Sequence, residues 1–82
     1  MLENNERFNV LLSQVFGINK NSINNETSPN NVDSWDSFRT LKMISKLEDE
    51  FRIKLDLKEV ILIKNVKDIK TLLAIKGVEI DL

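Results

Sequence analysis

The stretch DSFRTLKMISKLEDEF, residues 36–51, decides the fold of this 82-residue chain. Four of its apolar residues recur at the spacing of one helix face: Met43, Ile44, Leu47 and Phe51. A polar stretch rich in Asn and Ser comes directly before it. We therefore expect a helix from Ser37 to about Phe51 that buries this face in a core.

Ser37 stands at the expected N-terminus of this helix, directly after Asp36. The first turn of a helix has unpaired backbone N–H groups and the positive end of the helix dipole, so phosphate groups bind there readily. Ser37 is therefore a candidate attachment point for a phosphate-linked group. Ser34, which follows Asp33, is the alternative, but it precedes the bulky Trp35 and lies three residues before the helical pattern begins.

A second side of the same helix is also partly apolar. Phe38, Leu41 and Ser45 lie on this side at three- and four-residue steps. Two interpretations stay open: the side docks a partner, or Phe38 and Leu41 belong to a wide stripe that faces the core.

The preceding residues predict a first helix and a long connection. Five apolar residues mark one face of a helix from about Glu3 to Phe16, and Gly17 follows as its expected cap: Phe8, Leu11, Leu12, Val15 and Phe16. Residues 18–36 are rich in turn-forming Asn and Ser. We expect this loop to be pinned to the core by its four apolar residues: Ile18, Ile23, Val32 and Trp35.

The following residues predict two more helices. Asp56 and Glu59 have the spacing of a capping box, which indicates a short helix from Asp56 to about Ile61. Asn65 fits the N-cap of a last helix that ends at Gly77, with Asp68 in its first turn. We expect four residues of this helix to form its buried stripe: Val66, Ile69, Leu72 and Leu73. Residues 78–82 form a tail that the pattern does not place.

The predicted fold is all-α. It is a small antiparallel four-helix bundle with a long first loop and a short third helix. A strand at residues 60–63 would have no second strand to pair with. Eighty-two residues suffice for one domain, which we expect to span residues 1–82.

Composition excludes several functions. The chain contains no cysteine and no histidine, so zinc sites, thiol chemistry and Ser-His-Asp triads cannot be built from it. Its longest apolar runs, such as residues 60–63, are too short to span a membrane, and we expect a cytoplasmic monomer. The net charge is −1 and no basic stripe carries aromatic residues, so nucleic acid is not an expected partner.

Over nearly its whole length the chain resembles acyl and peptidyl carrier proteins. The resemblance centres on Trp35-Asp36-Ser37-Phe38, which is close to the Asp-Ser-Leu attachment motif of the family. Leu47-Glu48-Asp49-Glu50-Phe51 follows at the family's distance, with Phe51 fourteen residues after Ser37. Ile53, Asp56 and Asn65-Val66 then follow in family order.

The resemblance implies a covalent cofactor and a set of partners. Ser37 would carry 4′-phosphopantetheine through a phosphodiester, and Asp36 would help to bind the magnesium ion used by the phosphopantetheinyl transferase. Acyl or aminoacyl groups would be held on the arm as thioesters and delivered to acyl-loading and acyl-transferring enzymes. Five residues are the candidates for binding these partners: Phe38, Arg39, Leu41, Lys42 and Ser45.

Two features depart from the family pattern. Phe38 stands where leucine or methionine is commoner, and Arg39, Lys42 and Lys46 stand where many carriers are acidic. Partners in fatty-acid synthesis usually present basic patches, and like charges would slow docking to them. We therefore expect a dedicated carrier of a specialised pathway, such as polyketide or nonribosomal peptide synthesis or the modification of a surface polymer.

Two other functions compete with the carrier interpretation. One is a helical interaction module without a prosthetic group, which docks a partner through Phe38 and Leu41. The other is a small enzyme that uses Glu48, Asp49 and Glu50 as paired acids. Consecutive residues splay around a helix and do not converge, so a solvated helix face explains these three acids better.

Overall fold

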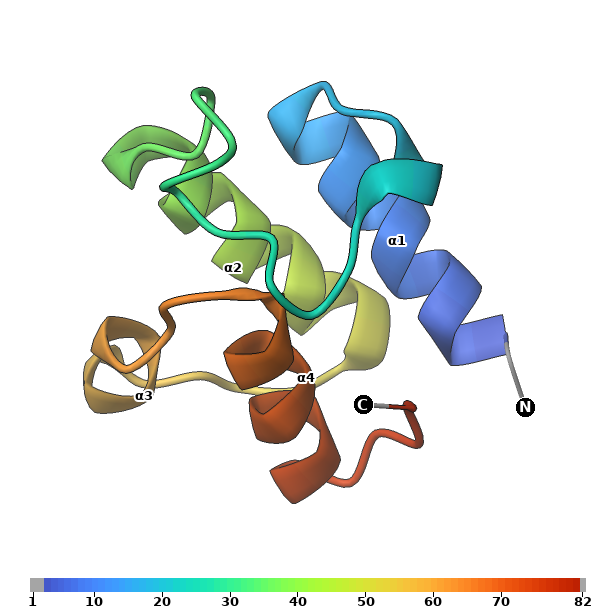
Figure 1. Cartoon of the computed structure of the whole chain (residues 1–82). Helices are drawn as coiled ribbons and strands as arrows, with labels where there is room; N and C mark the ends of the chain where they lie inside the picture. Colours follow the sequence, from blue (N-terminus) through green and yellow to red (C-terminus); the bar gives the residue numbers. More distant parts are fainter. Residues whose placement is uncertain (1–2, 82) are drawn as a thin grey trace.

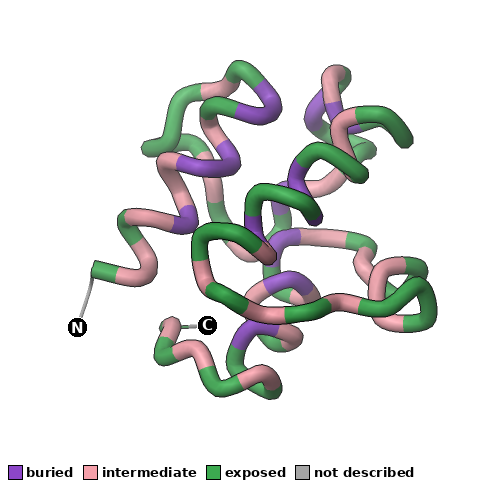
Figure 2. The backbone as a smooth tube through the Cα atoms, turned by 180° about the vertical axis from the view of Figure 1, so that it is seen from behind, coloured by how far each residue is buried: buried purple, intermediate pink, exposed green. Residues whose placement is uncertain are grey.

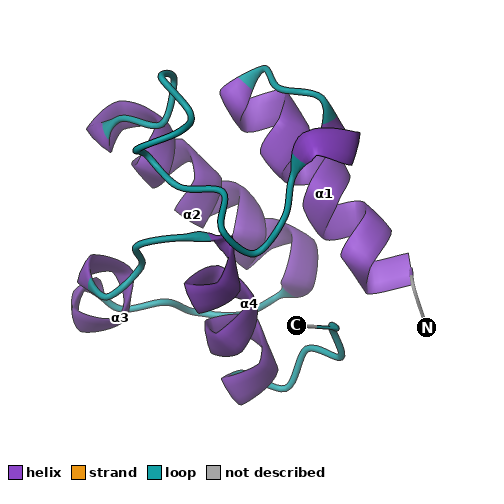
Figure 3. Ribbon diagram, viewed as in Figure 1, coloured by secondary structure: helices purple, strands orange, loops and turns teal. Residues whose placement is uncertain are grey.

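The computed structural model describes residues 3–81, and this part of the chain contains helices but no strand (Figures 1 and 3). The elements run in the order α1 (Glu3–Phe16), a 3₁₀ helix η1 (Lys20–Ser22), α2 (Ser37–Phe51), α3 (Leu57–Ile61) and α4 (Val66–Ile75). This is the predicted all-α four-helix bundle. The bounds of α1 and α2 match the sequence pattern, whereas η1 interrupts a loop that was expected to have no regular structure.

Three helices begin where a side chain caps them. The Asp36 side chain accepts a hydrogen bond from the Arg39 N–H and opens α2. Asp56 and Glu59 form the predicted capping box, so Asp56 is the N-cap and α3 starts one residue later than expected. Asn65 caps α4 by accepting from the N–H of Asp68. These short-range bonds fix the helix starts because they satisfy donors that would otherwise be unpaired.

The helix ends use the left-handed backbone region. Gly17 follows α1 with a φ of 67°, and Gly77 follows α4 with a φ of 94°. Both positions are the glycine caps that the sequence predicts. Arg52 ends α2 with a φ of 55°, a conformation that the sequence did not indicate because arginine rarely adopts it.

The core lies between α1, α2 and α4, and Figure 2 shows their buried stretches in purple. Every apolar residue expected on the core face of α1 is buried. Met43, Ile44 and Leu47 are buried on α2, and Phe51 packs against the core while partly exposed. On α4, Val66, Ile69 and Leu73 are buried as predicted, while Leu72 is only partly buried. None of the residues of α3 is buried.

The long loop between α1 and α2 is pinned to the core, as predicted. Val32 and Trp35 are buried, and Ile18 and Ile23 pack against the core cluster. The ring of Trp35 stacks on that of Phe16 with 4.8 Å between the centroids. This stacking ties the segment just before Ser37 to the end of α1.

The loop also contacts the start of α4 through backbone groups. The Val66 N–H donates to the Thr27 carbonyl at 2.9 Å, and the Lys67 N–H donates to that of Asn25 at 3.1 Å. Thr27 is buried, although nothing in its sequence context pointed to burial. The loop therefore helps to position α4 as well as α2.

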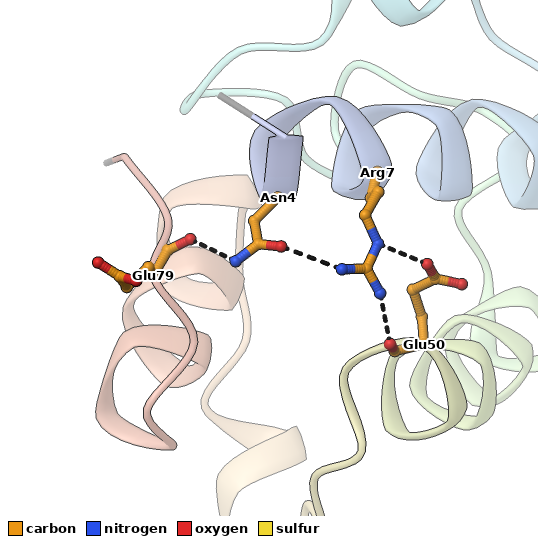
Figure 4. A network of polar contacts seen from close by, with 4 residues as sticks. All are labelled: Asn4, Arg7, Glu50 and Glu79. Carbon is orange, nitrogen blue, oxygen red and sulfur yellow. Dashed lines mark hydrogen bonds and ion pairs between the residues drawn. The ribbon is translucent and has the colours of Figure 1, made fainter. Parts of the chain in front are cut away.

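A polar cluster joins the start of α1 to the end of α2 and to the C-terminal tail (Figure 4). The Arg7 guanidinium donates to the Glu50 carboxylate and to the Glu50 carbonyl, both at 2.7 Å. The Asn4 side chain donates to the Glu79 carbonyl at 2.8 Å, and Asn5 pairs with the backbone of Asp81. The tail, which the sequence did not place, is thus attached to α1 as far as Asp81; Leu82 lies outside the described residues.

Candidate functional site

Ser37 is the first residue of α2 and is exposed to solvent. The side chain of Asp36 caps the helix by accepting a 2.8 Å hydrogen bond from the backbone N–H of Arg39. The backbone carbonyl of Asp36 accepts from the N–H and the hydroxyl of Thr40. Within residues 3–81, the N–H groups of Ser37 and Phe38 have no partner. An oxyanion attached to Ser37 would therefore meet free donors at the positive end of the helix dipole.

Ser34, the alternative attachment residue, is in a different environment. Its hydroxyl donates to the carbonyl of Phe16 at 2.6 Å, and the residue is partly buried. The oxygen of Ser34 thus serves to hold the loop on the end of α1. Of the two serines, only Ser37 has a hydroxyl that makes no hydrogen bond within residues 3–81.

A groove of about 510 Å³ borders Ser37. Nine residues from the loop, α2 and the α3 region line it: Pro29, Trp35, Asp36, Ser37, Thr40, Leu41, Val60, Ile61 and Ile63. Much of this lining is aliphatic or aromatic. Sequence reasoning missed the groove because it brings together segments that lie far apart in the chain.

The residues expected to bind partners lie on the outside of α2. Phe38 is 72% exposed and Leu41 is 67% exposed, and Lys42 and Ser45 are also exposed. Arg39 is partly exposed and forms a loose ion pair with Asp36 at 3.8 Å. The interpretation that Phe38 and Leu41 extend the core stripe is therefore wrong, because Met43, Ile44 and Leu47 already fill the side that faces the core.

Two of the three acidic residues near the end of α2 have separate structural tasks. Glu48 accepts a hydrogen bond from the N–H of Leu55 at 2.9 Å, while Glu50 is bound by Arg7. Asp49 is exposed. Among the described residues, no cluster of three side chains could hold a metal ion. The acidic side chains of this helix therefore do not converge in the way that the small-enzyme hypothesis requires.

The short helix α3 is fastened to the end of α4 by an ion pair. The ammonium of Lys76 lies 2.8 Å from the carboxylate of Glu59. This hydrogen bond, together with the one from the N–H of Asp56, holds the pKa of Glu59 below its usual value. The charged carboxylate thus helps to keep α3 in place beside the groove.

Comparison with known proteins places the chain in a family. A scan of family models and a search of curated proteins gave no match. Among solved structures, the holo acyl carrier protein of Geobacter metallireducens is 34% identical, with a TM-score of 0.78. The match covers 87% of this chain and 82% of the Geobacter protein. The chain belongs to the acyl carrier protein family.

A second solved structure agrees with this assignment. It is a proposed acyl carrier protein from Mycobacterium tuberculosis, 26% identical, with a TM-score of 0.76 and coverage of 85% of this chain and 93% of that one. The recognition made from the sequence is therefore confirmed, and the role is that of a carrier protein and not of an enzyme. In residues 3–81 the structure has no helix of the length and apolar character needed to cross a membrane.

Proposed function

We propose that this carrier protein holds acyl or aminoacyl intermediates as thioesters on a 4′-phosphopantetheine arm attached to Ser37, and delivers them to partner enzymes. The observation that supports this most directly is the exposed hydroxyl of Ser37 at the first position of α2. When bound, the arm supplies a terminal thiol that forms the thioester. The chain's own residues present the arm and receive the enzymes that act on it.

Each residue at the site has a proposed task. The Ser37 oxygen forms the bond to phosphorus when a phosphopantetheinyl transferase uses coenzyme A, and the adenosine bisphosphate leaves. Free N–H groups of the first turn favour the negative phosphodiester. Asp36 caps α2 and, in the transferase complex, shares its carboxylate with the magnesium ion. Phe38, Leu41 and their neighbours on α2 contact the partner enzymes.

Intact-protein mass tests the attachment. The purified chain is incubated with a broad-specificity transferase, coenzyme A and magnesium, and we expect a gain of one phosphopantetheinyl unit. Ser37→Ala should gain nothing. Ser34→Ala is the matched control, because it removes a hydroxyl three residues away and should still be modified in full. Modification of Ser37→Ala, or none of the unaltered chain, would refute the proposal; the latter result would favour an interaction module without a prosthetic group.

The basic residues of α2 support a narrower proposal, that the protein serves a specialised pathway. Arg39, Lys42 and Lys46 would repel the basic patches that fatty-acid enzymes present to carriers. We expect a housekeeping elongation enzyme to use the loaded protein far more slowly than its usual carrier. Equal turnover of the two carriers would contradict this assignment. A single domain over residues 1–82, a monomeric state and a cytoplasmic location stay predictions.

A further inference from the structure

The charges on the first three turns of α2 are all of one sign. From Ser37 to Leu47 the helix carries Arg39, Lys42 and Lys46 and no acidic residue. Lys42 and Lys46 are exposed, and neither has an ion-pair partner within the described range 3–81. Lys42 is therefore free to attract a negative surface, whereas Lys46 lines a pocket on the α1 side of α2 together with Glu6, Asp49 and Glu50.

The region of α3 across the groove does not offset this charge. Lys58 and Lys64 are exposed there. The one acid within α3, Glu59, is neutralised by Lys76, and Asp56 is engaged in capping the helix. Exposed lysines thus lie on α2 and in the α3 region, while the one charged residue in the lining of the groove is Asp36, which caps α2 and lies 3.8 Å from Arg39.

Exposed apolar side chains lie among these charges. Phe38 and Leu41 project from α2, and Ile61, which lines the same groove as Leu41, is 68% exposed. Leu57 and Leu62 are also exposed on the α3 side. Large apolar side chains inside a charged rim are typical of the central anchors of a protein interface.

We infer that the partner enzymes dock on this face through an acidic patch that surrounds an apolar socket. The inference rests on the proposed function and adds the sign of the partner's charge. Phe38 and Leu41 would fill the socket, while Lys42 faces a carboxylate at its rim. Charge complementarity of this kind raises the association rate and disfavours partners of the wrong sign.

An anionic lipid surface is negatively charged like the proposed acidic patch, but the position of the groove favours a protein partner. The groove of about 510 Å³ lies within the face, beside Ser37. This open depression borders the Ser37 hydroxyl, which a modifying or acyl-transferring enzyme must reach and a lipid surface need not contact. The geometry thus points to a protein partner, and lipid binding becomes an outcome of the test.

A charge-swap experiment tests the inference. The probe is a fatty-acid ketosynthase with a basic carrier-docking patch, used unaltered and with that patch reversed to glutamate. Both receive the acyl group from the loaded carrier protein, and the rate of transfer is measured. We expect transfer to the reversed enzyme to be about tenfold faster at low salt, with the advantage shrinking as salt screens the charges.

Two carrier variants complete the swap. Lys42→Glu should lose most of the preference for the reversed enzyme. Lys67→Glu changes the net charge equally, but on α4, and should keep the preference; Lys67 is likewise exposed and without an ion-pair partner in residues 3–81.

Three results would overturn the inference. The first is an equal rate of transfer to both ketosynthases, including no transfer to either. The second is a loss of the preference in Lys67→Glu to the same extent as in Lys42→Glu. The third is cosedimentation of the protein with phosphatidylglycerol vesicles that Lys42→Glu abolishes. Failure of the proposed function is distinguishable, because it shows earlier as the absence of a mass gain at Ser37.

Discussion

Replacing Asp36 separates its structural role from its proposed role in modification. In the structure the Asp36 carboxylate accepts a 2.8 Å hydrogen bond from the N–H of Arg39 and lies 3.8 Å from the guanidinium of the same residue. Asp36→Ala removes both contacts, whereas Asp36→Asn keeps an oxygen that can accept the first. The backbone bonds from Thr40 to the Asp36 carbonyl remain in both variants.

The two contacts differ in their expected contribution to stability. Loss of an N-cap acceptor costs about 1 kcal/mol, within a range of about 0.5–2 kcal/mol. The ion pair is exposed and contributes at most a few tenths of a kcal/mol, roughly the lower end for surface pairs. For a domain of this size, about 1 kcal/mol lowers the melting temperature by roughly 4–8 °C. We therefore expect that decrease for Asp36→Ala and less than about 2 °C for Asp36→Asn.

Thermal unfolding followed by circular dichroism measures the effect of each variant on stability. The rate of phosphopantetheinylation measures the effect on modification. Asp33→Ala is the matched control, since Asp33 is exposed and makes no side-chain hydrogen bond within residues 3–81. It should change neither quantity. Asp36→Asn should fold normally yet be modified much more slowly, because an amide is a poor ligand for magnesium compared with a carboxylate.

Two outcomes would refute this reasoning. A melting temperature of Asp36→Ala equal to that of Asp33→Ala would mean that the cap contributes nothing to the start of α2. Normal modification of Asp36→Asn would mean that the carboxylate is not needed by the transferase, even if Ser37 is the attachment residue.

Three further predictions concern the fold. Leu73→Ala removes a fully buried side chain of α4 and should cost about 2–5 kcal/mol in urea unfolding; a loss below that range would show that the core closes around the gap. Gly17→Ala places a side chain at a φ of 67° and should cost about 1–2 kcal/mol, so an unchanged urea midpoint would contradict the cap assignment. Because the folded-state pKa of Glu59 is lowered, its stabilising effect is present above the usual value of 4.5 and is lost as the pH falls through the folded-state pKa. Glu59→Gln should therefore lose stability at pH 7 and show a smaller further decrease on acidification, which unfolding midpoints across this pH range will reveal.

The sequence predicted those parts of the structure that depend on neighbouring residues. The capping residues Asp36, Asp56 and Asn65 act through bonds that span three residues, and such bonds can be inferred from spacing alone. The core faces of α1 and α2 follow from the helical period in the same way. The position of Ser37 at a helix start was predictable for this reason.

Long-range contacts could not be predicted from these patterns. The groove needs Trp35, Leu41 and Ile61 to meet, and their separation in the chain carries no signal of that. The hydrogen bond from Ser34 to Phe16 and the exposure of Phe38 likewise depend on how α1 and α2 pack together. An amphipathic pattern shows that a helix has a second apolar side, but only packing decides which side is covered.

The attachment of the tail to α1 has a consequence for protein engineering. Asn4 and Asn5 hold Glu79 and Asp81 beside the first turn of α1, at the end of the bundle where α2 finishes. Ser37 lies at the opposite end of that helix, about 21 Å away at 1.5 Å per residue. A short linker could therefore join Asn5 to Asp81, and a circular permutant opened elsewhere should retain its fold. A fluorescent protein or affinity tag fused before Glu3 or after Asp81 would attach at the end of the bundle away from Ser37.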